Sequence, residues 1–458
     1  MRMEAILLTR RRIVNLKHLF AALTLGLLAT TAGAQQTAPK VAIKSELASP
    51  VVLENTQDKN YLKVSLTGFP LNATKRSPIN LALVIDRSGS MSGDRIEQAT
   101  EAAVMAVNTL SAQDMLSVVI YDDVVDVIVP AAKLGNKEKL IHQIRERLTA
   151  RGGTALFAGV SRGIKETSKY LDKAHVNRII LLSDGQANVG PSSTSELAEL
   201  GKIAARKGIA ITTMGIGNGY NEDLMAAIAQ YSDGNHVFVQ NTADLEKAFA
   251  HEFGDVMSVV AQDVVVEIKV ADSVKPLRLL GREGNIRDNT VTVKLNQLYA
   301  NQEKYVMLEV LPAKGSAAQS KPLADVNVRY DNLATRQKDR WDEKMTITYT
   351  ALASEVEKAQ VEDVVVDSAI QKSAIQNEQA LKLIDEGKMD EAKAVLMGSV
   401  DALSSLPLSA PAPRMKAQES AEENRQLLQK LETESKEASR KSLKEQNYKT
   451  QNQSSKAN

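Results

Sequence analysis

The sequence contains no cysteine, and only one tryptophan and five histidines among 458 residues. The absence of cysteine excludes disulfide bridges, thiolate zinc sites, iron–sulfur clusters and thiol nucleophiles. An excess of one charge is also missing, since 57 Lys and Arg balance 56 Asp and Glu to a formal charge of +1. No overall field favours a nucleic acid or an anionic lipid surface, so neither is expected as a partner. With 43% hydrophobic residues, the chain can bury more than one core.

An apolar run long enough to span a bilayer is missing too. The longest candidate, Leu19–Thr31, follows the basic residues Arg10–Arg12 and Lys17 and ends at the small residues 32–34. It is shorter than the roughly 20 residues of a membrane span, which favours a cleaved signal peptide over residues 1–34 rather than a membrane anchor. The mature chain is expected to be exported, to the periplasm first of all, with secretion or surface association as alternatives, and to lack a membrane span.

Between residues 79 and 256, short apolar runs alternate with amphipathic segments, which predicts an α/β fold with a doubly wound, mostly parallel, Rossmann-like sheet covered by helices on both faces. The expected strands are Asn80–Ile85, Leu116–Tyr121, Val124–Val129, Arg178–Leu182, Ile209–Ile216 and His236–Val239.

The flanking segments carry other patterns. Residues 258–352 alternate with a period of two between turn residues, which predicts an antiparallel β-sandwich, and the strands expected within 41–76 would complete it. Residues 355–404 predict a helical hairpin. Residues 405–458 form a proline-containing linker followed by a polar tail, which is expected to be partly disordered.

Oxygen-bearing side chains follow two of the predicted buried strands and precede one helix. Asp86, Ser88 and Ser90 come after the apolar run 81–85, Asp184 follows the run 179–182, and Thr154 lies in a Gly-Gly-Thr loop before a helix. Ligands of doubly wound sheets bind beyond the carboxyl ends of the strands, where these loops are expected to meet. Five oxygen donors favour Mg²⁺, with Mn²⁺ or Ca²⁺ as alternatives, over zinc or copper.

Taken together, the three segments resemble the metal-ion-dependent adhesion site of the von Willebrand factor A (VWA) domain family, and residues 79–256 resemble that domain in strand and helix order. The resemblance implies that Ser88, Ser90 and Thr154 bind the ion directly or by conformation. It implies that Asp86 and Asp184 act directly or through water. An Asp or Glu of a partner protein would then complete the coordination of the ion.

The layout of the whole chain resembles exported bacterial proteins labelled as homologues of calcium-activated chloride channels, and more distantly the inter-alpha-trypsin inhibitor heavy chains. The implied function is non-enzymatic, metal-dependent protein binding of the adhesion type. Two alternatives remain open: a periplasmic scaffold or assembly factor with a structural metal, and a metal-assisted hydrolase, for which no general base is evident beside the site.

Several polar residues near the motifs have simpler interpretations. Asp86, Ser88 and Ser90 could instead form a turn that caps the next helix. Asp94 with Glu97 indicates a capping box. Asp122, Asp123 and Asp126 would mark a turn between strands, and the mixed charges of 436–444 would form a solvated helix face.

Overall fold

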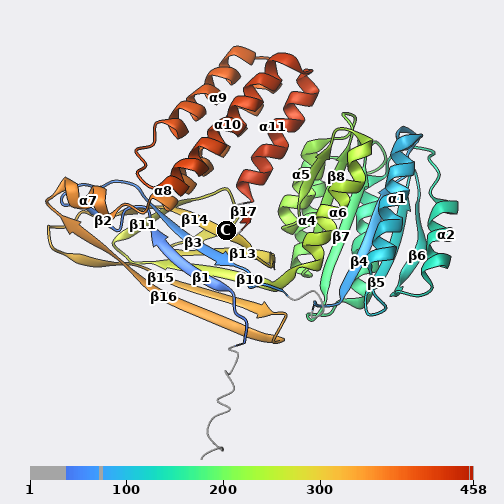
Figure 1. Ribbon diagram of the computed structural model, residues 1–458, viewed down its shortest axis with the longest axis horizontal. Coiled ribbons are helices and arrows are strands. Elements are labelled where there is room, and N and C mark those ends of the chain that lie inside the picture. Colours follow the sequence, from blue (N-terminus) through green and yellow to red (C-terminus); the bar gives the residue numbers. More distant parts are fainter. Residues whose placement is uncertain (1–37, 72–75, 453, 457–458) are drawn as a thin grey trace, which may run out of the picture. The chain divides into compact units, whose positions relative to one another are not determined.

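The computed structural model describes residues 38–71, 76–452 and 454–456 (Figure 1). The signal peptide expected over residues 1–34 lies outside these residues. No helix in the described part combines the length and the apolar character needed to cross a membrane.

The predicted α/β fold is confirmed. One six-stranded sheet has the order β6-β5-β4-β7-β8-β9, and all neighbours are parallel except β6, which forms an antiparallel hairpin with β5. Every residue of β4, β5, β7 and β8 is buried, as expected of strands covered on both faces. The strands are β4 (Ile79–Asp86), β5 (Met115–Tyr121), β6 (Val125–Lys133), β7 (Val176–Ser183), β8 (Ala210–Ile216) and β9 (His236–Val239).

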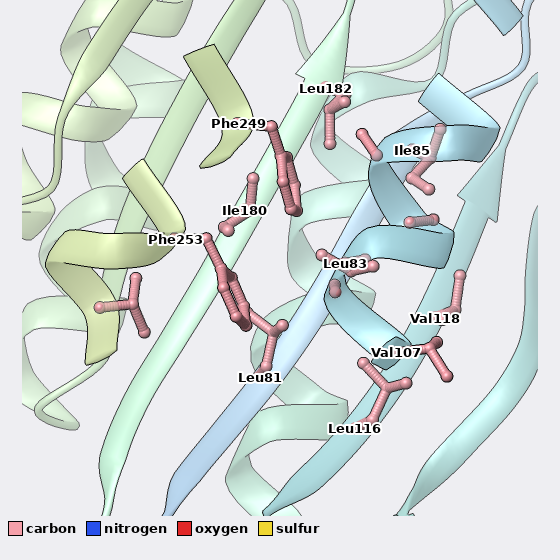
Figure 2. Close-up of a cluster of buried hydrophobic side chains, with 14 of the residues drawn as sticks. Leu81, Leu83, Ile85, Val107, Leu116, Val118, Ile180, Leu182, Phe249 and Phe253 are labelled. Carbon is pink, nitrogen blue, oxygen red and sulfur yellow. The ribbon is translucent and has the colours of Figure 1, made fainter. Parts of the chain in front are cut away.

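Six helices cover this sheet in two layers. α1 and α6 pack on one face, where Val107 of α1 and Phe249 and Phe253 of α6 belong to one buried cluster with Leu81 and Leu83 of β4 (Figure 2). α3, α4 and α5 supply the apolar side chains on the other face. The helices are α1 (Asp94–Thr109), α2 (Lys137–Arg147), α3 (Leu156–Thr167), α4 (Thr194–Arg206), α5 (Glu222–Ser232) and α6 (Leu245–Met257).

Strands that precede and strands that follow the α/β domain in the sequence share two further sheets. One runs β1-β3-β14-β11 and the other β12-β13-β10-β15-β16-β2, so strands before residue 70 pair with strands after residue 300. Their bounds are β1 (Ala42–Leu47), β2 (Val51–Leu53), β3 (Asn60–Thr67), β10 (Val259–Val270), β11 (Val274–Leu280), β12 (Asn285–Arg287), β13 (Thr290–Tyr299), β14 (Gln302–Pro312), β15 (Ser320–Asn332), β16 (Gln337–Thr350) and β17 (Ser454–Lys456), which pairs with β14.

Three of these strands, β11, β12 and β17, are not expected from the sequence. β11 contains Pro276 and is mostly half-exposed, so its pattern is weak, and it lies at the edge of its sheet, where proline is tolerated. β12 has three exposed residues and carries no apolar alternation.

The expectation of a partly disordered tail is wrong for most of residues 405–458. The helices here are α7 (Ala353–Ala359), α8 (Glu362–Asp385), α9 (Met389–Ser404), α10 (Pro411–Thr433) and α11 (Lys436–Gln451) (Figure 1). The apolar residues of the last two helices are few but well placed, because Leu427, Leu431 and Leu443 join a core with α8 and α9. Pro411 occupies the first position of α10, where a missing N–H costs nothing.

Candidate metal centre

The candidate site lies at the carboxyl ends of two neighbouring strands. β4 ends at Asp86, and Asp184 follows directly after the last residue of β7. The strands are parallel and Ile85 pairs with Leu182, so the register brings both aspartates to the same edge of the sheet. Thr154 reaches this edge from the loop that precedes α3.

Direct contacts join four of the five predicted side chains. Asp86 accepts a hydrogen bond of 2.8 Å from the backbone N–H of Ser88. The hydroxyl oxygens of Ser88 and Ser90 lie 3.1 Å apart, and the Ser90 hydroxyl donates to Oδ1 of Asp184 over 2.8 Å. The loop after β4 is therefore tied to the loop after β7 by these side chains.

Gly185 shows how close the fifth residue lies. A Cβ atom at this position would be 2.9 Å from Oγ1 of Thr154, 3.4 Å from Oγ of Ser90 and 3.6 Å from Oδ2 of Asp86. Oxygens from two of the three loops thus surround this point, and the third loop, which carries Asp184 and Gly185, approaches them closely because Gly185 has no side chain. The five residues form one cluster of oxygen donors, and this ligand type fits a hard divalent cation.

Both carboxylates of the cluster are buried. Burial raises the pKa of Asp86 to about 6, and the neighbouring charge of Asp184 acts in the same direction. Hydrogen bonds from the Ser183 hydroxyl, 2.6 Å away, and from Ser88 oppose this rise because they favour the ionised form. Two carboxylates buried this close together favour a positive charge beside them.

Arg95 also contacts this cluster and is not among the site residues predicted from the sequence. Its guanidinium donates hydrogen bonds to Oδ2 of Asp184 and, over 2.9 Å, to the carbonyl oxygen of Ser90. A signal was present, because Arg95 lies in the first turn of α1, where the helix dipole favours acidic residues over basic ones. A cation at that position indicates a partner outside the helix.

The acidic residues of the β5–β6 turn also do more than mark a turn. Asp122 is buried and accepts a hydrogen bond of 2.7 Å from Nε of Arg151, and it forms an ion pair with Arg87. Asp123 accepts a hydrogen bond from the N–H of Gly153 over 3.0 Å. These contacts hold the loop that carries Thr154 against the loop that carries Asp86.

The capping box expected at Asp94 and Glu97 is absent. α1 begins at Asp94 itself and its N-cap is Gly93, with no side-chain hydrogen bond to the cap. Both acids lie in the first turn instead, where they favour the positive end of the helix dipole.

Comparison with known proteins identifies the part of the chain that holds this site. Residues 80–251 match the model of the von Willebrand factor type A domain. The uncharacterized protein sll0103 of Synechocystis sp. is 28% identical over 63% of this chain and 70% of its own length. YfbK of Escherichia coli is 28% identical over 46% of this chain and 37% of its own. Inter-alpha-trypsin inhibitor heavy chain H3 of Rattus norvegicus is 28% identical over 37% and 20%.

The match therefore spans most of the first relative but only about a third of YfbK and a fifth of the heavy chain. Two solved structures share the fold over most of this chain. A von Willebrand factor type A protein from Catenulispora acidiphila has a TM-score of 0.68 at 16% identity, covering 86% of this chain and 91% of its own. The ArnB paralog VWA2 from Sulfolobus acidocaldarius has a TM-score of 0.61 at 17% identity, covering 90% and 98%.

Proposed function

Because residues 80–251 form a von Willebrand factor type A domain, we propose that this chain binds an acidic side chain of a partner protein through a divalent cation. Domains of this family typically mediate protein–protein interaction. The cation, Mg²⁺ in the first instance, would be held by Asp86, Ser88, Ser90, Thr154 and Asp184. The observation that carries the proposal is the convergence of three loops: oxygens of two loops surround the position beside Gly185, and the Ser90 hydroxyl donates a hydrogen bond to Asp184 of the third.

The chemistry of these donors supports an adhesive role. Two carboxylates neutralise the charge of a divalent ion. The three hydroxyl groups are neutral ligands, so the octahedral shell of the ion is not filled with strong ligands. Positions that water occupies remain available to a carboxylate from another molecule. When bound, the cation would supply the electrophilic contact for that carboxylate, while this chain's residues hold the ion in place.

Capture of a partner is expected to require both the cation and Thr154. Thr154→Val keeps the shape of the side chain but removes the hydroxyl oxygen. The wild-type chain should retain a protein from a periplasmic extract in Mg²⁺ and release it in EDTA, whereas Thr154→Val should retain little of it in either buffer. Capture that is equal in Mg²⁺ and EDTA would contradict the proposal. This experiment also presupposes the export and periplasmic location that we propose from residues 1–34.

The close approach of Gly185 to Thr154 gives a second prediction. In Gly185→Ala the new methyl group would lie 2.9 Å from Oγ1 of Thr154, closer than such contacts normally are, so the threonine must shift. We expect Mn²⁺ affinity, measured by calorimetry, to fall by about 10- to 100-fold, the range found when the surroundings of metal ligands are disturbed. Gly190→Ala is an unsuitable control because its φ is +80°, whereas Gly135→Ala meets nothing within 4 Å and should bind like the wild type.

A scaffold role is the second candidate, in which the cation mainly stabilises the top of the sheet. The ionic contacts between α11 and the α/β domain favour it, because they tie the C-terminal helices firmly to that domain. We propose that neither role involves catalysis. Chelator-sensitive turnover of a substrate would point instead to metal-assisted hydrolysis.

A further inference from the structure

Arg95 lies at the rim of the oxygen cluster with part of its side chain in solvent. Its side chain is 36% exposed, and it forms an ion pair with Asp184. The guanidinium group lies across Gly217, because three of its atoms are 3.2–3.7 Å from the position that a Cβ of residue 217 would take. The lack of a side chain at Gly217 therefore leaves room for this group.

Two other arginines lie near the same rim, but both form ion pairs with other carboxylates. Arg87 forms ion pairs with Asp122 and Asp126. Arg151 also pairs with Asp122. Among these three arginines, Arg95 is the one whose ion pair joins the oxygen cluster.

The two oxygens of the Asp184 carboxylate have different neighbours. Oδ1 accepts the hydrogen bond from the Ser90 hydroxyl and so faces the other oxygen donors. Oδ2 accepts the hydrogen bond from Arg95. Arg95 therefore does not need to leave Asp184 for Oδ1 to serve a cation.

From this arrangement we propose that Arg95 remains on Asp184 when a divalent cation binds and that its charge helps to recruit the partner's carboxylate. The inference rests on the proposed function. Asp86, Asp184 and Arg95 together carry one negative charge, and with a divalent ion bound the same groups carry one positive charge. A partner's carboxylate restores neutrality in this largely buried site, so binding of an acidic group is favoured over binding of a neutral one.

This role predicts opposite effects on two measurements when Arg95 becomes glutamine. Mn²⁺ should bind about tenfold more tightly, because a positive charge beside the site is removed. Acetate, used as the carboxylate probe, should bind the Mn²⁺-loaded protein about tenfold more weakly, because a charge that attracts it is lost. Mn²⁺ affinity can be followed by the electron paramagnetic resonance of free Mn²⁺. Acetate binding can be followed by the relaxation of water protons as acetate displaces water from the bound ion.

Two further variants test whether position or charge alone matters. Arg95→Lys keeps the charge and should recover part of the acetate affinity. Arg145→Gln removes a charge from a side chain that is 54% exposed and paired with Glu101, outside the site, and should change either affinity less than about threefold. Thermal unfolding in EDTA checks that each variant is folded.

The outcomes separate this inference from the proposed function. If Arg95→Gln weakens both Mn²⁺ and acetate binding, Arg95 supports the structure of the site and does not recruit an acid. If Mn²⁺ binds more tightly and acetate binding is unchanged, Arg95 only competes with the ion; both results overturn the inference and leave the proposed function standing. If acetate displaces no water from Mn²⁺ on the wild-type protein, the proposed function fails and the role of Arg95 fails with it.

Discussion

Substitution of Asp86 by asparagine is expected to weaken divalent-cation binding by at least about 100-fold. Unit charges about 4 Å apart interact by about 4 kcal/mol at an effective dielectric constant of about 20. Loss of even about 3 kcal/mol corresponds to a 100-fold loss of affinity. Titration of the purified variant with Mn²⁺ by calorimetry measures this effect. The same variant should lose the Mg²⁺-dependent capture of a partner.

The same substitution should make the metal-free protein more stable. Burial raises the pKa of Asp86 to about 6, above the ordinary value of 3.8, so folding at pH 7 must hold a charge that the surroundings disfavour. A carboxyl group whose pKa is higher in the folded state lowers the free energy of unfolding as the pH rises from about 4 through 6. At pH 7 this cost is present in full. Each tenfold change in proton affinity corresponds to about 1.4 kcal/mol, so the neutral amide should recover up to about 3 kcal/mol.

Asparagine is the right replacement because it preserves the hydrogen bonds of Asp86. Its oxygen can still accept from the Ser88 N–H, and the Ser183 hydroxyl can turn to accept from the amide nitrogen. Asp94→Asn is the matched control, since Asp94 is an exposed carboxylate just beyond the same loop. Mn²⁺ affinity within about threefold of the wild type in Asp86→Asn would contradict a role for this carboxylate in holding the ion. A lower melting temperature in Mg²⁺ with partner capture intact would favour the scaffold role.

The α/β domain and the residues of its candidate site could be predicted because the pattern is local and redundant. Fully apolar runs such as Leu81–Ile85 identify central parallel strands. Asp86 follows this run directly, and Asp184 follows the run 179–182 after one serine. The rule that ligands bind at the carboxyl ends of such strands then places Asp86 and Asp184 together without further information. Thr154 is predicted as a site residue from its position in the Gly-Gly-Thr loop. What these residues bind stays a proposal.

Individual ion pairs between segments distant in sequence could not be predicted. The pairing of Arg95 with Asp184 joins a helix to a loop 89 residues away, and nothing in either segment specifies the other. The mixed charges of 436–444 predict a solvated helix face, which is where such charges usually lie. Instead Arg440 and Lys441 are largely buried against Glu222 at the start of α5, which is a wrong prediction caused by a partner 218 residues away.

Glu222→Gln is expected to release α11 from the α/β domain. Glu222 is 8% exposed and accepts hydrogen bonds from Arg440 and, over 2.5 Å, from Lys441. Arg440 keeps Asp223 and Asp385, but Lys441, whose side chain is 6% exposed, keeps among the described residues the ring of Tyr220 at 4.9 Å and no other ion pair. Removing one partner of a buried ion pair typically costs about 3 to 5 kcal/mol, because the other charge stays buried without compensation.

Hydrogen exchange is the measurement that isolates this effect, because α11 can open without unfolding of the whole chain. A loss of about 3 kcal/mol should speed exchange of the protected amides of 436–451 by about 100-fold, while amides of α1 should exchange as before. Asp385→Asn is the matched control: it removes another carboxylate from the same Arg440, but Asp385 is 47% exposed, so the cost should stay below about 1 kcal/mol. The double variant Glu222→Gln with Lys441→Met removes the uncompensated charge and should restore most of the protection. Fast exchange that persists in the double variant would mean that Glu222 positions α5 itself, and that the ion pair does not hold α11 in place.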